Sequence, residues 1–434
     1  MKLSRPRGMR DFLPEEMLLR RGVIEKIREV FESFGFGELD TPAMEHWEIL
    51  SAKCGEEVLE QIYAFEDKAG RRLGLRFDLT VPLARVAVMN PGLPKPFKRY
   101  AIGKAWRYEE PQSGRLREFL QADADIVGCP YMDADAEVLA VAVEALKKLG
   151  LPDFEIRLNN RKVLEGLARE AGVPEGRELD AFRALDKLDK IGVEGVLEEF
   201  EARGLGRSVG EEMLNLAASG GEEVLAEAEK RLAKHEVAAE GLRELREILE
   251  LAEAYGYKNS IVVDLSLARG LDYYTGPIYE VKVKTYAAGS VAGGGRYDKL
   301  IEILGGPPTP ATGISLGVER IVEVLKEARG GGGRKTKTQV FVAVTDPTLR
   351  SEAIKVAREL RSRGVCCELD LMQRRLSRQL EYADSKGIPL AVIVGRRELE
   401  RGLFTLKDLR TWSQKAASLD EIAEEALEMG RERT

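Results

Sequence analysis

Residues 98–128 read KRYAIGKAWRYEEPQSGRLREFLQADADIVG, and the fold of the chain depends on this stretch. Side chains of a strand alternate between its two faces, so one face of the first half carries mostly small residues and ends in Arg107 and Glu109. The polar centre contains Pro, Ser and Gly, which predict a loop. A second strand is predicted from about Glu118, so the stretch is expected to form a hairpin.

The return strand of this hairpin places Gln121, Asp123 and Asp125 on one face. The loop between the strands adds two arginines, Arg115 and Arg117. Burying so many polar groups without partners is costly. The pattern therefore leaves two interpretations open: a ligand site lined by small residues, or a solvated sheet face with paired charges.

Arg-x-Glu at the end of a strand, followed by a loop with another Arg, resembles motif 2 of the class II aminoacyl-tRNA synthetases. Two later regions agree. LARGLDYYTG at 267–276 resembles the histidine-specific signature of the histidyl-tRNA synthetases, and GGGRYD at 293–298 with GISLGVER at 313–320 resembles their motif 3 region. The three motifs in this order are highly specific for the histidyl-tRNA synthetases. The similarity to this family covers nearly the whole chain. RFDLT at 76–80 resembles its archaeal and eukaryotic branch.

The amino-acid composition and the hydrophobic periodicity change along the chain in a way that fits this family. One long block is rich in Glu, Lys, Ala and Leu with helical periodicity. The later ARGGGGRKTK reads as a flexible linker, and short apolar strands then alternate with helical segments. The resemblance implies an α+β catalytic domain with an antiparallel sheet at 1–157 and 258–327, a helical insertion domain at 158–257, a linker at 328–337 and an α/β anticodon-binding domain at 338–434.

The N-terminal segment predicts an amphipathic helix. Pro14 suits its first turn, apolar residues up to Phe34 follow at spacings of three and four, and Gly35 marks its end. Residues 36–42 then predict a short strand that Pro42 ends. The helix and the strand resemble motif 1 of the family, which implies a homodimer.

Two further runs alternate apolar and polar residues. LGLRFDLTVP at 73–82 predicts a strand with Asp78 and Thr80 on its polar face. From Ser260, the second run predicts a strand whose apolar face ends in Arg269. An Arg there needs an anionic partner, because an isolated buried charge is expensive. The glycines at 293–295 allow close backbone approach, although GGGRYD alone is a weak, loop-like signal.

Composition limits the class of protein. The 434 residues suffice for two or three domains, and the net charge of −7 gives no overall basic signature. Any contact with nucleic acid must therefore come from local patches of positive charge. Residues 338–412 carry 14 Lys and Arg against 10 Asp and Glu, so this part of the chain is locally basic. The four Cys lack metal-ligand spacing and read as reduced thiols. With no apolar run of ~20 residues and no signal core, we expect a cytoplasmic protein that does not bind membranes.

The resemblance implies a histidine–tRNA ligase reaction. L-Histidine and ATP would give histidyl-adenylate, and the histidyl group would then pass to the 3′ end of tRNA(His). The first step brings two anions together, so it needs positive charge more than a base. Arg107 and Arg269 are the expected catalytic residues, and Mg²⁺ is expected with ligands that the sequence does not identify. The family pattern implies that histidine contacts Asp78, Thr80, Arg107, Gln121, Asp125, Arg269, Tyr273 and Tyr274, and that ATP contacts Arg107, Glu109, Arg115 and Arg320.

Two alternatives have the same fold without this activity. One is a regulatory paralogue, similar to the regulatory subunit of ATP phosphoribosyltransferase, which binds histidine without charging tRNA. The resemblance of the C-terminal part to an anticodon-binding domain argues against it. The other is a non-catalytic RNA-binding or stress-sensing protein, which would be expected to lose some of the ATP-binding arginines. Arg107, Arg115 and Arg320 are all present.

Overall fold

The computed structural model describes residues 3–52, 56–111, 114–151, 153–217, 222–268, 273–284, 289–328 and 335–432. The chain divides into two compact units. The first consists of Met1–Arg10 with Val23–Ala328, and the second of Asp11–Gly22 with Arg329–Thr434. In the described part of the chain, no helix is long and apolar enough to cross a membrane.

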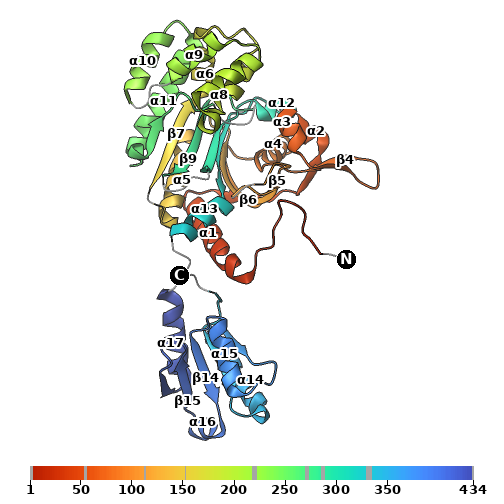
Figure 1. Cartoon of the computed structure of the whole chain (residues 1–434), viewed down its shortest axis with the longest axis vertical. Helices are drawn as coiled ribbons and strands as arrows, with labels where there is room; N and C mark the ends of the chain where they lie inside the picture. The colour runs from red at the N-terminus through yellow and green to blue at the C-terminus, as the bar shows by residue number, and fades with distance from the viewer. Residues whose placement is uncertain are drawn as a thin grey trace. The chain divides into compact units, whose positions relative to one another are not determined.

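A mixed eight-stranded sheet forms the centre of the first unit (Figure 1). All of its inner pairings are antiparallel, and only the two edge strands run parallel to their neighbours. The strands, in spatial order, are β1 (Gly37–Glu38), β5 (Phe97–Trp106), β6 (Glu118–Val127), β11 (Ala311–Gly317), β10 (Ser290–Arg296), β9 (Pro277–Val283), β7 (Phe154–Asn160) and β8 (Ile261–Val263).

The predicted hairpin is confirmed as the antiparallel pair β5–β6. Its register sets Gln121 opposite Gly103 and Asp123 opposite Ala101, so each polar side chain faces a small partner. The glycines at 293–295, predicted as a weak loop-like signal, lie in β10. A Cβ on Gly294 would come within 2.0 Å of the Gly313 carbonyl oxygen, so the close pairing of β10 with β11 requires glycine.

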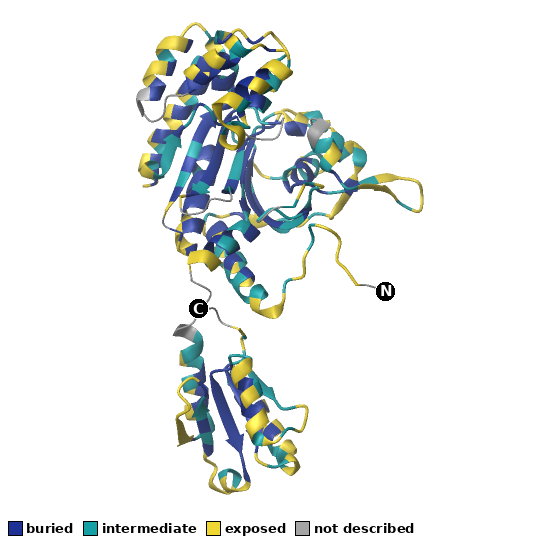
Figure 2. Cartoon of the chain, viewed as in Figure 1, coloured by how far each residue is buried: buried dark blue, intermediate teal, exposed yellow. Residues whose placement is uncertain are grey.

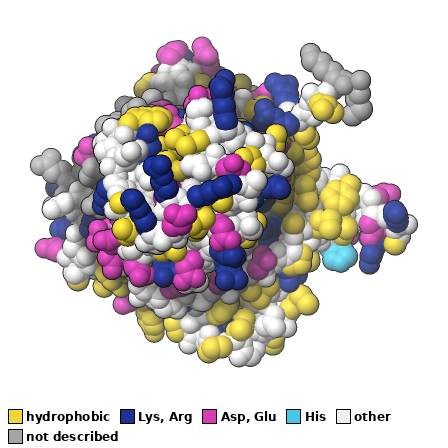
Figure 3. Space-filling model, turned by 90° about the horizontal axis from the view of Figure 1, so that it is seen from below, with side chains coloured by type: hydrophobic (Ala, Val, Ile, Leu, Met, Phe, Trp, Pro, Cys, Tyr) yellow, Lys and Arg dark blue, Asp and Glu magenta, His cyan; other side chains and the backbone are white. Residues whose placement is uncertain are grey.

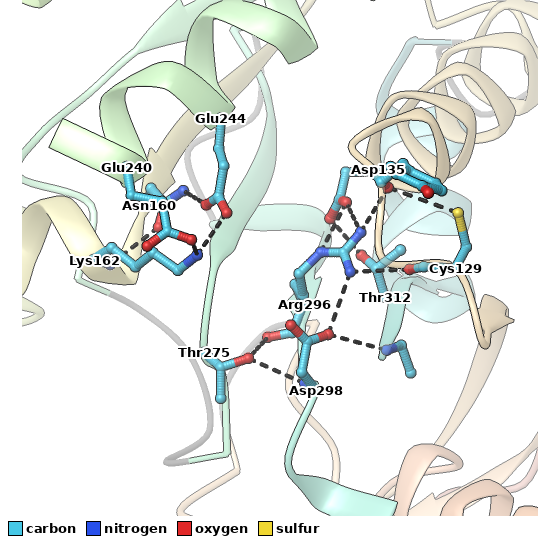
Figure 4. Close-up of polar contacts among 12 residues, drawn as sticks. Cys129, Asp135, Asn160, Lys162, Glu240, Glu244, Thr275, Arg296, Asp298 and Thr312 are labelled. Carbon is cyan, nitrogen blue, oxygen red and sulfur yellow. Dashed lines mark hydrogen bonds and ion pairs between the residues drawn. The ribbon is translucent and has the colours of Figure 1, made fainter. Parts of the chain in front are cut away.

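Helices cover the large sheet, whose strands form the dark-blue core in Figure 2. α5 (Asp133–Leu149) is buried along most of its length and packs against β11 and β6. Its Asp135 forms a buried ion pair with Arg296 of β10, and Arg296 also donates to the Cys129 and Tyr131 carbonyls (Figure 4). The other helices on this sheet are α1 (Pro14–Ser33), α12 (Leu300–Ile303) and α13 (Val318–Ala328).

The N-terminal helix is confirmed as α1. It begins at Pro14, buries Ile27 and Phe31, and gives way to Gly35 in the left-handed region at φ 78°. The strand predicted over 36–42 is shorter, and only Gly37–Glu38 pairs with β5.

A second, three-stranded sheet lies in the same unit, and it corrects one prediction. The strand predicted over 73–82 ends at Leu75, and α4 begins at Thr80. The Asp78 side chain accepts a hydrogen bond from the Val81 N–H at 3.0 Å, which satisfies a donor in the first turn of α4. The elements here are β2 (Met44–His46), β3 (Ala64–Glu66), β4 (Arg72–Leu75), α2 (Trp47–Ser51), α3 (Glu56–Gln61) and α4 (Thr80–Met89).

Within the described residues, six α-helices and one 3₁₀ turn lie between β7 and β8. The strand predicted from Ser260 is likewise short, because it ends at Val263 and the Asp264 side chain accepts from the Ser266 N–H in a turn. The Asn160 side chain caps α6, while Lys162 pairs with Glu240 and Glu244 of α11 (Figure 4). The helices are α6 (Arg161–Glu170), α7 (Glu178–Leu185), α8 (Leu188–Ala202), α9 (Arg207–Ala217), α10 (Glu222–Leu232) and α11 (Glu236–Ala254), with the 3₁₀ turn η1 (Lys258–Ser260) after them.

The second unit has its own five-stranded sheet, and its three predicted apolar strands are confirmed. β13 (Cys367–Leu369), β12 (Val340–Val344) and β14 (Leu390–Val394) are parallel. β15 (Phe404–Asp408) and β16 (Gln414–Ala417) continue the sheet in antiparallel pairing. The remaining elements are η2 (Pro347–Leu349), α14 (Arg350–Ser362), α15 (Leu376–Ser385), α16 (Arg396–Arg401) and α17 (Leu419–Glu432).

Candidate active site

A cavity of about 380 Å³ lies on the large sheet where β6, β10 and β11 adjoin. This volume is within the range of small-molecule sites. The loop after β5, the residues just before α4 and the start of α13 contribute to its lining, as do residues of α3 and β9 together with Asp186, Leu267, Tyr273 and Tyr274. Nine of the residues expected at the site line it: Asp78, Thr80, Arg107, Glu109, Arg115, Gln121, Tyr273, Tyr274 and Arg320.

Three arginines bring positive charge to this cavity, two from the loop between β5 and β6 and one from α13. Arg107 is fixed by a 3.0 Å hydrogen bond from its Nε to the Phe77 carbonyl. Arg115 forms an ion pair with Glu109 across the loop. Arg320 donates to the Gly114 carbonyl at 3.3 Å, so α13 holds the same loop from the other side. Guanidinium groups suit phosphate and carboxylate recognition because their donors form a planar fork.

Asp78 and Tyr273 form a buried acceptor and donor pair beside these arginines. The Tyr273 hydroxyl donates to Asp78 at 3.2 Å. Burial raises the pKa of the Asp78 carboxyl, an effect that the Val81 N–H and Arg107 partly offset. Burial also raises the pKa of Tyr273 well above its ordinary value, so this phenol remains a donor at neutral pH.

Gln121 and Asp123 lie next to each other along the cavity face of β6. The Gln121 amide donates to the Ser315 hydroxyl at 2.6 Å, whereas its Oε1 atom is buried without a hydrogen-bond partner. The Oδ1 atom of Asp123 is also buried without one. Unpaired buried acceptors are costly, and here they face a cavity that admits a ligand with N–H donors.

Sequence reasoning did not propose Asp123 as a site residue, although it placed Asp123 on the same strand face as Gln121. Burial raises the pKa of Asp123 to about 7, and the neighbouring Asp125 carboxyl adds to the shift, while Arg99 opposes it. The signal that identifies this residue is cross-strand register, because Asp123 lies opposite Ser315 of β11 and Ala101 of β5. That register could not be read from one strand alone.

Asp125 was expected to contact the ligand, but it is not among the described residues that line the cavity. Its carboxylate forms a 2.9 Å ion pair with Arg99 and accepts a hydrogen bond from Tyr297, all within the core. A Cβ at Gly313 would come within 2.0 Å of Asp125 Oδ1, so glycine at 313 is what makes room for this side chain. Alternation correctly gives the shared face of β6, but it does not show how far along that face the cavity extends.

Arg269, the second expected catalytic residue, lies outside the described residues. Glu319 is a further residue that sequence reasoning did not assign, and its carboxylate accepts from the Leu120 N–H at 2.8 Å. Among the described residues, no group of three or more His, Cys, Asp and Glu could hold a metal ion. Mg²⁺ is commonly bound by one or two carboxylates together with substrate phosphates, and Glu109 and Glu319 in the cavity lining fit that role.

The second unit carries aromatic and cationic side chains on its surface. Arg374 stacks over the Tyr382 ring at 4.5 Å, and Lys407 lies 4.9 Å from the ring centre of the exposed Trp412. Such pairs are typical of surfaces on which bases stack. On the face shown in Figure 3, basic and acidic side chains are interspersed, so the positive charge in that view is local.

Comparison with known proteins shows which proteins this chain resembles. The family model described as Histidyl-tRNA synthetase matches residues 8–321, and the model described as Anticodon binding domain matches residues 339–429. The histidine–tRNA ligase of Aeropyrum pernix is 46% identical over 421 residues, which cover 96% of each chain. That of Pyrococcus furiosus is 41% identical over 427 residues, covering 97% of this chain and 98% of the relative. The crystal structure of histidyl-tRNA synthetase from a Nostoc species is similar with a TM-score of 0.85 and 32% identity, covering 99% of this chain and 100% of that one.

Proposed function

The chain belongs to the histidyl-tRNA synthetase family, and from this premise we propose that its cavity on the large sheet is where histidine and ATP react. The activity is that of an ATP-dependent aminoacyl-tRNA ligase specific for histidine. The observation that carries the proposal is the convergence of Arg107, Arg115 and Arg320 with the buried acceptors Asp78 and Gln121 in one cavity.

In the first step, a carboxylate oxygen of histidine attacks the α-phosphorus of ATP, and the bond to the bridging oxygen breaks to release pyrophosphate. No proton has to move, so the step depends on fixed positive charge. We assign Arg107 and Arg269 to the carboxylate and α-phosphate. Glu109 is assigned to the adenine, and Arg115 and Arg320 to the nucleotide phosphates and base. Mg²⁺ would neutralise phosphate charge when bound, with Glu319 of the cavity lining as a candidate ligand.

Histidine would be oriented by the opposite side of the cavity. Asp78, Thr80 and Gln121 are assigned to the α-ammonium group, because carboxylate and amide oxygens accept its charge-assisted hydrogen bonds. Tyr273 and Tyr274 are assigned to the imidazole, but Asp125 is not, because its carboxylate pairs with Arg99 in the core. To these we add Asp123, which lines the cavity where Asp125 does not.

In the second step, a hydroxyl of the terminal tRNA ribose attacks the histidyl carbonyl, and AMP leaves. We propose that residues 338–434 bind the anticodon, that the helices within 158–257 reach toward the acceptor stem, and that 328–337 link the two parts. The catalytic domain would then be 1–157 with 258–327. We further propose a homodimer through the motif 1 region and a cytoplasmic location.

The alternative of a histidine-binding regulatory paralogue is less well supported. Such a protein needs no anticodon-binding domain, whereas the corresponding family model matches residues 339–429 of this chain. It also needs no ATP site, whereas three arginines line the cavity.

The function is tested by measuring histidine-dependent exchange of pyrophosphate into ATP, followed by charging of tRNA. Exchange with charging is expected. Histidine binding without exchange would indicate the regulatory paralogue. A chain that ends at Gly333 should retain exchange but charge tRNA poorly, and normal charging by a folded, dimeric truncated protein would remove the anticodon assignment.

Arg269 requires its own test, because its planar fork is proposed to hold two anions at once. Arg269→Ala should slow adenylate formation by about 10²–10³, with Arg269→Lys restoring part of the rate. Transfer from preformed adenylate should suffer much less. Equal losses in both steps, together with a large fall in thermal stability, would instead make Arg269 a structural ion-pair partner.

A further inference from the structure

The N-terminal residues before α1 lie against the loop that joins β5 to β6. Pro6 and Met9 close a turn through a 3.1 Å backbone hydrogen bond, and Gly8 lies within it. The Gly8 carbonyl accepts a 2.8 Å hydrogen bond from the N–H of Arg117, at the end of the loop. Arg7 pairs with Glu110 of the same loop at 2.6 Å, but both side chains are mostly exposed, so this pair contributes little. The principal contact is therefore that between Gly8 and Arg117.

Arg117 in turn joins the two ends of the loop. Its carbonyl accepts from the Arg107 N–H at 3.0 Å, and its Nε donates to the Glu109 carbonyl at 2.8 Å. Its guanidinium lies 3.9 Å from the ring centre of Tyr108. Arg117 as a residue is only 7% exposed, so its hydrogen bond to the Glu109 carbonyl is largely shielded from water, although the Tyr108 ring is 55% exposed. Arg117 thus fixes the backbone of the residue that is proposed to contact the adenine.

Two features of position 8, its backbone conformation and its close packing, both require glycine. Its φ of +78° lies in the left-handed region, which is unfavourable for residues with a Cβ. An added Cβ would also come within 2.7 Å of Arg117 Cγ and 2.9 Å of Pro111 Cγ. A substitution at this position would therefore displace Arg117 as well as strain the N-terminal turn.

We propose that Gly8 is a positioning residue for the ATP site, which acts by holding Arg117 at the base of the loop that carries Glu109 and Arg115. The inference rests on the proposed function, because it takes that loop to be the adenine and phosphate side of the cavity. Gly8 does not line the cavity, so the lining residues alone do not show that ATP binding depends on it.

The test compares Gly8→Ala with Gly70→Ala in the full-length protein. Gly70 has a φ of +76° in the turn between β3 and β4, and a Cβ there would meet nothing within 4 Å. It therefore controls for backbone strain alone. Gly8→Ala should raise the KM for ATP in pyrophosphate exchange about tenfold, because small misplacements of positioning groups have large kinetic effects. The KM for histidine should change less than about twofold, and Gly70→Ala should change neither.

Two outcomes would overturn the proposal: an unchanged KM for ATP in Gly8→Ala, or equal rises in the KM for ATP and for histidine. If Gly8→Ala melts well below Gly70→Ala, Arg117→Lys decides the question, because it keeps the charge and the contact with Gly8 but removes the guanidinium contacts to Tyr108 and Glu109. It too should raise the KM for ATP selectively, and a parallel rise in both constants would overturn the proposal. Failure of the proposed function is distinguishable, because the unsubstituted protein would then show no histidine-dependent exchange.

Discussion

The two units bury different kinds of polar groups. The core around the proposed catalytic cavity contains many buried ionisable residues, whereas within the described residues 335–432 the polar residues buried as a whole are Gln339 and Gln379, and the buried Asp370 carboxylate is paired with Arg374. Both glutamines are bonded through oxygen and nitrogen: Gln379 to the backbone of Val344, and Gln339 to the backbone of Cys366 and Ala426. The buried ionisable groups of the first unit include Asp78, Arg99, Asp123, Asp125, Asp135 and Arg296.

This difference fits the functions proposed for the two units. A surface that binds nucleic acid needs only a rigid scaffold beneath it, so its core can be apolar with every polar atom paired. A site that aligns two anions needs charges and acceptors held away from water before the ligand arrives. Gln121 and Asp123 therefore keep unpaired acceptors, and the ligand would supply the missing donors. We expect the first unit to sacrifice stability for this preorganisation, and the following variants test that expectation.

The largest expected effect is at the buried pair of Asp135 and Arg296. Asp135→Asn leaves the Arg296 guanidinium buried beside a neutral amide, which should lower the free energy of unfolding by about 3–5 kcal/mol. Denaturant unfolding of the first unit measures it. The double variant Asp135→Asn with Arg296→Met should recover part of the loss, because the uncompensated charge is gone. A cost below about 1 kcal/mol for Asp135→Asn would show that this pair does not hold α5 to the sheet.

In the second unit, an apolar deletion should have a comparable cost without affecting adenylation. Leu390 of β14 is fully buried, so Leu390→Ala should destabilise that unit by about 2–5 kcal/mol through lost burial and a cavity. Charging of tRNA should lose heat resistance at a lower temperature than pyrophosphate exchange does. Coincident loss of both activities on heating would mean that the two units unfold together.

A smaller effect concerns pH, and it should have opposite signs in the two units. Unfolded Asp123 titrates near a pKa of about 3.9. In the folded chain its pKa is raised to about 7 by burial, with Asp125 adding to the shift and Arg99 opposing it. Between these two pKa values the folded state binds more protons than the unfolded state does. The contribution of protonated Asp123 to the free energy of unfolding is therefore complete below pH ~4 and is lost as the pH rises toward 7. Asp123→Asn should remove a slope of up to about 1.4 kcal/mol per pH unit.

Asp346 of the second unit is the matched control. The Thr348 N–H and hydroxyl lower the pKa of its carboxyl, so its contribution is present at neutral pH and is lost as the pH falls through the lowered pKa. Asp123→Asn should be more stable than the parent protein, and this gain should grow between pH 4 and 7. Asp346→Asn should be less stable than the parent, and this loss should be larger at pH 7 than at pH 3. Parallel curves for Asp123→Asn and the parent would show that Asp123 titrates normally.

The smallest expected effect is at an exposed ion pair of the second unit. Arg363, the residue after α14, places its Nε atom 2.9 Å from Oδ1 of Asp420 in α17, but the Asp420 side chain is 78% exposed. Asp420→Asn should therefore change the free energy of unfolding by less than about 1 kcal/mol, and added salt should reduce the difference further. A cost as large as that of Asp135→Asn would break the contrast between the two units.

The sequence by itself determined the elements whose signals are local. The hairpin β5–β6 and the helix that begins at Pro14 follow from periodicities of two and 3.6 residues, and the strands β12, β13 and β14 follow from short apolar runs. The resemblance of short motifs to a known family likewise implied nine of the residues that line the cavity, because each motif lies within one short stretch.

Only the tertiary structure decided how these elements meet. Alternation at 73–82 did not reveal that Asp78 caps a helix, and the shared face of β6 did not reveal that the cavity reaches Asp123 while Asp125 pairs with Arg99 in the core. The pairing of Asp135 with Arg296 joins residues 161 positions apart, and no local pattern encodes it. Local periodicity fixes which way a side chain points along its own element. What it meets depends on the register and packing of elements distant in the chain, and that is set by the burial of the whole core.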